Sequence, residues 1–103
     1  MGFRRNDWML IEAAGMLGIA VVLSGCGNAL FAVQASRASR NLEHAREMGA
    51  ETLAPYEYYY AAEHLKKARM EASEADYGDA RILAKESNDY ALKAIRIVEG
   101  AGQ

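Results

Sequence analysis

Residues 77–98 read YGDARILAKESNDYALKAIRIV, and the spacing of the small and apolar side chains in this stretch decides the fold. These side chains recur at alternating steps of three and four residues, which is typical of helices that pack side by side along a narrow seam. The seam consists of Tyr77, Ala80, Ala84, Ser87, Ala91, Ala94 and Val98. The stretch therefore predicts a long amphipathic helix.

The flanks of the stretch indicate where this helix begins and ends. Asp76 is a suitable N-cap, because its carboxylate can accept hydrogen bonds from the free N–H groups of the first turn. Gly100 and Gly102 are expected to end the helix. Ser87 is expected to bond to a backbone carbonyl one turn back. Contact with two neighbouring helices is predicted because three residues widen the stripe: Leu83, Tyr90 and Ile97.

Two earlier segments repeat this spacing. The first seam consists of Phe31, Ala35, Ala38, Leu42 and Ala45. The second consists of Tyr58, Ala61, Leu65, Ala68, Ala72 and Ala75. Met48-Gly49 is expected to end the first helix, and Pro55 is expected to open the second, because its missing N–H and fixed φ suit a first helical position.

The three seams together predict an all-α chain. We expect a small antiparallel three-helix bundle, or a helical hairpin with an extra N-terminal helix, after a cleaved signal peptide. The helical domain is expected over residues 31–99 and a flexible C-terminus over residues 100–103. Because alanine dominates the seams, the helix axes can approach closely while each contact buries little apolar area.

The N-terminus has the order of a secretory leader. Arg4 and Arg5 form a charged region, and a mostly apolar run extends from Trp8 to Leu23. This run is shorter than the about 20 residues that a transmembrane helix needs, and it includes Glu12. We therefore predict a signal peptide over residues 1–25. The alternative is an uncleaved anchor helix that buries a lone cysteine.

Leu23, Ser24, Gly25 and Cys26 resemble the lipobox of bacterial lipoproteins position for position. The resemblance implies that a signal peptidase recognises residues 23–25 and that Cys26 carries diacylglycerol and an N-acyl chain. Residues 26–30 would form the lipidated tether, with the lipid bilayer as a partner and with no other cofactor. Because Gly27 rather than Asp follows the cysteine, the resemblance favours the periplasmic face of the outer membrane. The inner membrane is the alternative.

The charge pattern excludes one class of partner. The chain has a formal net charge of −2, and charges of both signs alternate along it without a basic block. Nucleic-acid binding needs a clustered basic surface, so no nucleic-acid partner is expected. The same absence argues against a polybasic membrane-binding segment. Attachment to a membrane would have to come from acyl chains, two or more of which hold stably.

The stretch from Asn41 to Ala94 resembles the domain-of-unknown-function family numbered 4398. The resemblance lies in Ala45-Arg46-Glu47-Met48-Gly49-Ala50, Leu53-Ala54-Pro55-Tyr56-Glu57 and Ala75-Asp76-Tyr77, with Ala80 and Leu83-Ala84. It implies a small bacterial envelope lipoprotein with three helices in a tetratricopeptide-like arrangement. The family often has Gly where Ala75 stands here. Peptidoglycan binding is not carried over, because it belongs to OmpA-like domains that accompany other members.

Four tyrosines crowd the start of the second predicted helix. Successive helical residues project about 100° apart, so Tyr56, Tyr58, Tyr59 and Tyr60 cannot all face one core. One interpretation packs Tyr58 inward and lays the others along the first helix with their hydroxyls in water. The other treats Tyr56, Tyr59 and Tyr60 as a partner-binding surface, because Tyr is enriched at protein interfaces.

The chain offers few residues for catalysis or metal binding. His44 and His64 fall on different predicted helices, and neither has a second His or Cys at ligand spacing, so no metal is expected and both are interpreted as surface histidines. No arrangement of nucleophile and base is recognisable, so we predict no catalytic residues and no enzyme activity.

The sequence therefore predicts a membrane-anchored envelope lipoprotein that acts as a non-enzymatic tether or scaffold for a protein partner in the envelope. The alternative is a tetratricopeptide-like regulatory adaptor that binds a peptide or an envelope-stress signal. A single helical pair forms little of the concave groove that repeat arrays use, which favours the tether.

Overall fold

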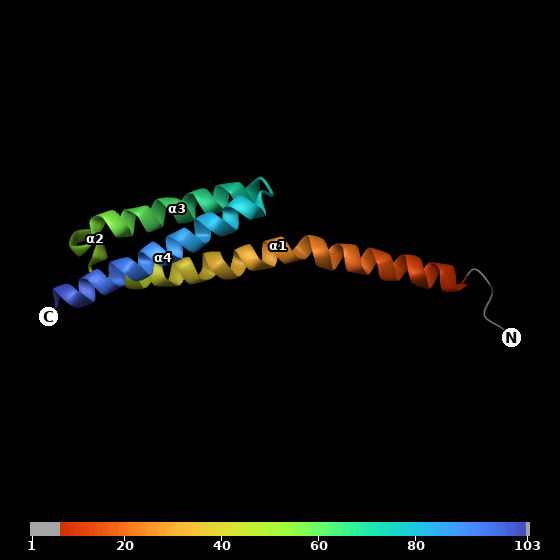
Figure 1. The fold of residues 1–103 in the computed structure, drawn as a ribbon, viewed down its shortest axis with the longest axis horizontal. Coiled ribbons are helices and arrows are strands. Elements are labelled where there is room, and N and C mark those ends of the chain that lie inside the picture. Colours follow the sequence, from red (N-terminus) through yellow and green to blue (C-terminus); the bar gives the residue numbers. More distant parts are fainter. Residues whose placement is uncertain (1–6, 103) are drawn as a thin grey trace.

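The computed structural model describes the backbone of residues 7–102 and the side chains of residues 27–102. Its elements are α1 (Asp7–Glu47), α2 (Ala50–Leu53), α3 (Pro55–Ser73) and α4 (Tyr77–Ala101), and the described residues contain no strand. Figure 1 shows α1, α3 and α4 packed lengthwise. Helix α3 runs antiparallel to α1 and α4, which run parallel to each other. The predicted all-α bundle is confirmed.

Helix α1 is 41 residues long and extends well past the other helices at its N-terminal end (Figure 1). Residues 23–30, where the cleavage site and tether are expected, fall within it. The side chains of Leu23, Ser24, Gly25 and Cys26 lie outside the described part, as does the start of the leader. Over the residues that the structure covers, no helix combines the length and apolarity needed to cross a membrane.

The connection from α1 to α3 contains the short helix α2, which the spacing of apolar residues does not reveal. Gly49 has φ 89°, a left-handed conformation that suits glycine, and its N–H donates to the carbonyl of Arg46 at 3.0 Å. The chain then makes one more turn before Pro55 opens α3 at its first position. The predicted ends at Gly49 and Pro55 are confirmed.

The turn between α3 and α4 closes with a pair of backbone hydrogen bonds typical of a Schellman motif. The N–H of Ala75 donates to Ala72 at 3.0 Å, and that of Asp76 donates to Glu71 at 2.9 Å. Ala75 itself has φ 61° and is exposed. Its predicted place in the second seam is therefore wrong, because the helix has ended before it. Asp76 caps α4 as predicted, since its carboxylate accepts from the N–H of Asp79 at 3.4 Å.

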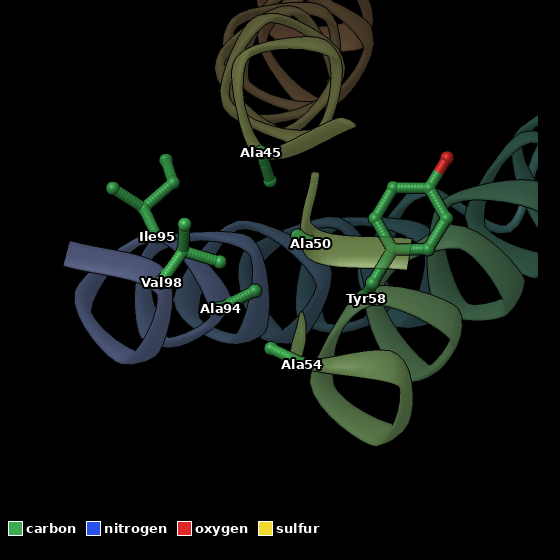
Figure 2. Close-up of a cluster of buried hydrophobic side chains, with 7 residues drawn as sticks. All are labelled: Ala45, Ala50, Ala54, Tyr58, Ala94, Ile95 and Val98. Carbon is green, nitrogen blue, oxygen red and sulfur yellow. The ribbon is translucent and has the colours of Figure 1, made fainter. Parts of the chain in front are cut away.

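The core is built mainly from alanines of the three predicted seams. One cluster lies near the C-terminal end of α4, where Figure 2 shows side chains from all three long helices converging with α2. Its members are Ala45, Ala50, Ala54, Tyr58, Ala94, Ile95 and Val98. A second cluster lies further along the bundle and contains Ala35, Ala38, Leu65, Ala68 and Ala84. Leu42 packs against both.

Helix α4 packs against both α1 and α3, as its wide stripe predicts. Toward α1, the side-chain amide of Asn41 donates to the amide oxygen of Asn88 at 2.7 Å. Toward α3, the hydroxyl of Ser87 donates to the carbonyl of Ala61 at 2.6 Å. The predicted acceptor one turn back in the same helix is therefore wrong, because the close approach of α3 brings a carbonyl nearer. Helix α4 also continues through Gly100 to Ala101, so only Gly102 ends it.

Candidate partner-binding surface

The four tyrosines at the start of α3 divide between the core and the surface. Tyr58 is buried, as one interpretation of the sequence predicts. Tyr56 and Tyr59 are 65% and 52% exposed, and Tyr60 is half-buried. We call Tyr56, Tyr59 and Tyr60 the tyrosine surface. All three belong to the first turns of α3, which begins at Pro55.

The tyrosine surface packs against an aromatic stack formed by side chains of α3 and α4. The ring of Tyr60 lies between His64, at 3.8 Å and 16°, and Tyr90 of α4, at 3.8 Å and 26°. Tyr56 completes the group, with its ring centre 6.0 Å from Tyr60 and 6.3 Å from Tyr90. The predicted packing of Tyr60 along the first helix is therefore wrong. Its partner is α4, which holds the ring in one orientation.

Polar contacts fix the stack at its base. His64 Nδ1 lies 2.9 Å from the carbonyl oxygen of Tyr60, and Nε2 lies 3.3 Å from Glu86 Oε2. These contacts join His64 to the backbone of its own helix and to α4. Lys93 Nζ lies 5.3 Å from the ring centre of Tyr90, within range of a cation–π interaction. His64 is thus half-buried and engaged, whereas His44 is exposed as predicted.

The tyrosine surface borders a shallow, open hollow of about 500 Å³, whose wall is mostly aromatic. Its lining consists of Pro55, Tyr56, Tyr59, Tyr60, Glu63 and His64. Burial raises the pKa of Tyr60, and the nearby Glu86 carboxylate and the neighbouring tyrosines raise it further. The hydroxyl of Tyr60 therefore stays protonated and able to donate a hydrogen bond at neutral pH. The arrangement suits contact with an apolar or aromatic group.

Two parts of this site were not recognised as such from the sequence. Tyr60 and His64 are four residues apart, a spacing that brings side chains together on a helix and that could have indicated their stacking. No sequence spacing indicated the contact between Tyr60 and Tyr90, because Tyr90 belongs to α4 and the contact depends on how α3 and α4 are aligned. The sequence assigned Tyr90 only to the widened stripe.

Three acidic residues gather at the turn between α3 and α4. Carboxylate oxygens of Glu71, Asp76 and Asp79 lie within 4.8 Å of one another. Asp76 is already engaged as the cap of α4. Carboxylates near a helix N-terminus are stabilised by the positive end of the helix dipole, which accounts for two of the three.

The comparisons with known proteins identify the family of this chain. The profile of the domain of unknown function DUF4398 matches residues 33–100, most of the described bundle. The chain belongs to the DUF4398 family. No curated protein and no solved structure matches this DUF4398 protein. The match covers the tyrosine surface and the aromatic stack, while Leu23–Cys26 precedes it.

Proposed function

We propose that this DUF4398 protein is a lipid-anchored, non-enzymatic tether or scaffold of the bacterial envelope. In this proposal a signal peptidase cuts before Cys26, and acyl chains on Cys26 hold the bundle at the periplasmic face of the outer membrane. The tyrosine surface then binds a protein partner in the envelope. The proposal draws on the Leu23–Cys26 motif and on exposed aromatic rings, which are frequent anchors of protein interfaces.

The observation that carries the proposal is the position of these two features at opposite ends of the bundle. A Cβ built at Gly27 would lie only 3.4 Å from the Cβ of Tyr77, so the position after Cys26 lies beside the first residue of α4. Helix α3 starts at the other end (Figure 1). With a rise of 1.5 Å per residue, Tyr59 lies about 20 Å from the Ser73 end of α3. The tyrosine surface would thus lie far along the bundle from the lipid anchor, where a partner can reach it.

The anchor is tested by labelling cells that express the full chain with radioactive palmitate. We expect label on the wild-type protein and none on Cys26→Ala. The variant should also leave the membrane fraction. Label that persists in Cys26→Ala, or a wild-type protein without label, would contradict the lipid anchor. A soluble adaptor, the alternative function, would keep activity in Cys26→Ala, whereas a tether would lose it.

The partner surface is tested by crosslinking in cells followed by mass spectrometry. Tyr59→Ala should reduce recovery of one specific envelope protein about tenfold, as truncation of an aromatic hot spot does. Met70→Ala is the matched control, because Met70 is also exposed but lies near the other end of α3. Equal recovery with both variants would show that the tyrosine surface is not the interface.

A further inference from the structure

A second exposed apolar area lies between α1 and α4, at the end of the bundle near Cys26. Leu30 and Val33 of α1 are 51% and 50% exposed, and Ile82 of α4 is 57% exposed. Leu30 and Ile82 line a shared hollow of about 200 Å³ together with Gln34, Arg81 and Lys85. We call Leu30, Val33, Arg81, Ile82 and Lys85 the α1–α4 patch. Its apolar centre and cationic edge are not explained by packing within the bundle.

We propose that the α1–α4 patch rests on the surface of the phospholipid bilayer that holds the acyl chains of Cys26. This inference rests on the proposed function, because it requires the lipid on Cys26. It adds the orientation of the bundle: α1 and α4 lie against the membrane, and the tyrosine surface faces away from it. The ligand chemistry is that of acyl chains bordered by anionic phosphate groups.

The helical register of α1 supports this orientation. Helix α1 runs without a break through position 26, and positions 26, 30, 33 and 37 of a continuous helix share one face. Leu30 comes one turn after Cys26, about 6 Å along the axis. An anchor inserted at position 26 therefore brings Leu30 and Val33 to the depth at which amphipathic helices bury their apolar side chains.

Charge complementarity supports the same face. The two charged residues that line the hollow, Arg81 and Lys85, are both cations, and Arg37 is exposed further along α1. Lys85 also pairs with Asp89, with 2.8 Å between Nζ and Oδ2. Interfacial helices use Lys and Arg beside an apolar strip in this way, because the cations contact phosphates while the apolar side chains enter the acyl boundary.

The acidic residues at the α3–α4 turn distinguish between two orientations of the bundle, one with its long axis along the membrane surface and one with its long axis perpendicular to it. Glu71, Asp76 and Asp79 occupy the same end of the bundle but belong to the turn and to the side of α4 near α3, where Glu71 and Asp79 share a hollow with Ile82. An upright bundle would press these carboxylates against lipid phosphates, where like charges repel. A bundle that lies on the α1–α4 patch keeps them in water. Because Ile82 borders both hollows, the charge distribution favours a bundle that rests on the α1 side of Ile82, with Arg81 and Lys85 toward the phosphates and the carboxylates on the α3 side in water.

The test places a photoreactive benzoyl-phenylalanine at position 82 of the full, lipidated chain in cells. Position 59 in the tyrosine surface is the matched control, with similar exposure of the native residue. After irradiation, we expect phospholipid adducts from position 82 to exceed those from position 59 by about tenfold, as contact with the interface requires. Adducts from position 82 that are only protein, or that match position 59 in lipid yield, would overturn the inference.

A charge reversal separates lipid contact from mere proximity. Arg81→Glu with Lys85→Glu should lower the lipid adducts from position 82 about threefold or more, because anionic lipids then repel the patch. Lys66→Glu with Lys67→Glu on α3 changes the net charge equally and should leave the yield unchanged. Equal loss in both pairs would overturn the inference. Palmitate labelling of Cys26 in the same cells reports separately on the anchor, so failure of the orientation and failure of the proposed function are distinguishable.

Discussion

Each of the two turns of the bundle depends on one residue with a positive φ, and the conformational cost differs between the two residues. Gly49 adopts a positive φ that costs glycine little. Ala75 adopts φ 61° with a Cβ, which crowds the following carbonyl. The hydrogen bonds of Ala75 and Asp76 to the end of α3 hold this strained conformation in place. The second turn is therefore a local weak point in an otherwise regular fold.

Replacing Ala75 with glycine should stabilise the protein. Ala75→Gly removes a left-handed penalty of about 1–2 kcal/mol but makes the unfolded chain more flexible, so the expected net gain is about 0.5–1 kcal/mol. Urea denaturation followed by circular dichroism measures it. Ala72→Gly is the control, because Ala72 is in regular helix and glycine there should destabilise by about 0.5–1 kcal/mol. A loss of stability in Ala75→Gly would show that the turn is not strained.

Tyr58 links stability to pH at the far end of the bundle. Burial raises the pKa of its phenol, and the Glu51 carboxylate beside the hydroxyl raises it further. The folded state therefore holds this proton more tightly than the unfolded chain, so stability is complete below the ordinary tyrosine pKa of about 10 and falls as pH rises through the folded pKa. Tyr58→Phe should lose less stability than the wild type between pH 8 and pH 11 in urea titrations. An identical loss in both proteins would exclude Tyr58 as the source.

At the scale of helices, alanine seams determine the spacing between α1, α3 and α4. Ala61 and Ser87 have no exposed surface, and the hydroxyl of Ser87 reaches a backbone carbonyl of the neighbouring helix. Such contact requires that no larger side chain separate the two backbones. Because each alanine buries little apolar area, this geometry gives precise spacing with modest stabilisation per contact.

Enlarging one seam position should therefore be costly. Ala84 is fully buried and belongs to the cluster shared by the three long helices. Ala84→Leu should destabilise by about 1–3 kcal/mol, because added methylenes push apart a packed interface. Arg96→Leu is the matched control at an exposed position of α4 and should change stability by less than about 0.5 kcal/mol. Denaturant titration measures the free energies of unfolding. Equal destabilisation by the two variants would mean that the helices can move apart at Ala84 with little loss of stability.

At the scale of the whole molecule, a few larger side chains carry much of the apolar burial. The cluster near the C-terminal end of α4 contains Tyr58, Ile95 and Val98. The cluster nearer the α3–α4 turn contains Leu65. Leu42 packs against both and joins them into one core. A small domain of this kind has only a few kcal/mol of stability to lose.

Truncation of Leu65 should accordingly remove much of the total stability. Leu65 is 3% exposed, and Leu65→Ala should cost about 2–5 kcal/mol through lost burial and a residual cavity. Leu53→Ala provides the comparison, because Leu53 is 53% exposed and its truncation should change little. Thermal melts of the two variants would separate them clearly. Matching melts would place Leu65 outside the cooperative core.

The alignment of helices could be predicted only in part. The seams identified the buried alanines of α1, α3 and α4, and Gly49, Pro55 and Asp76 marked the ends of helices. Each of these signals lies within a few residues along the chain. The stacking of Tyr60 on Tyr90 and the donation from Ser87 to Ala61 join α3 to α4 across a long stretch of sequence. No local pattern encodes such pairs.

The sequence by itself determined the helices and their inward faces, because helical period and capping are properties of short segments. Tertiary structure alone decided the acceptor of Ser87 and the stack beneath the tyrosine surface. It also brought Leu30 and Ile82 into one patch. These depend on how far one alanine seam slides along another, which is settled by the packing of all three helices together.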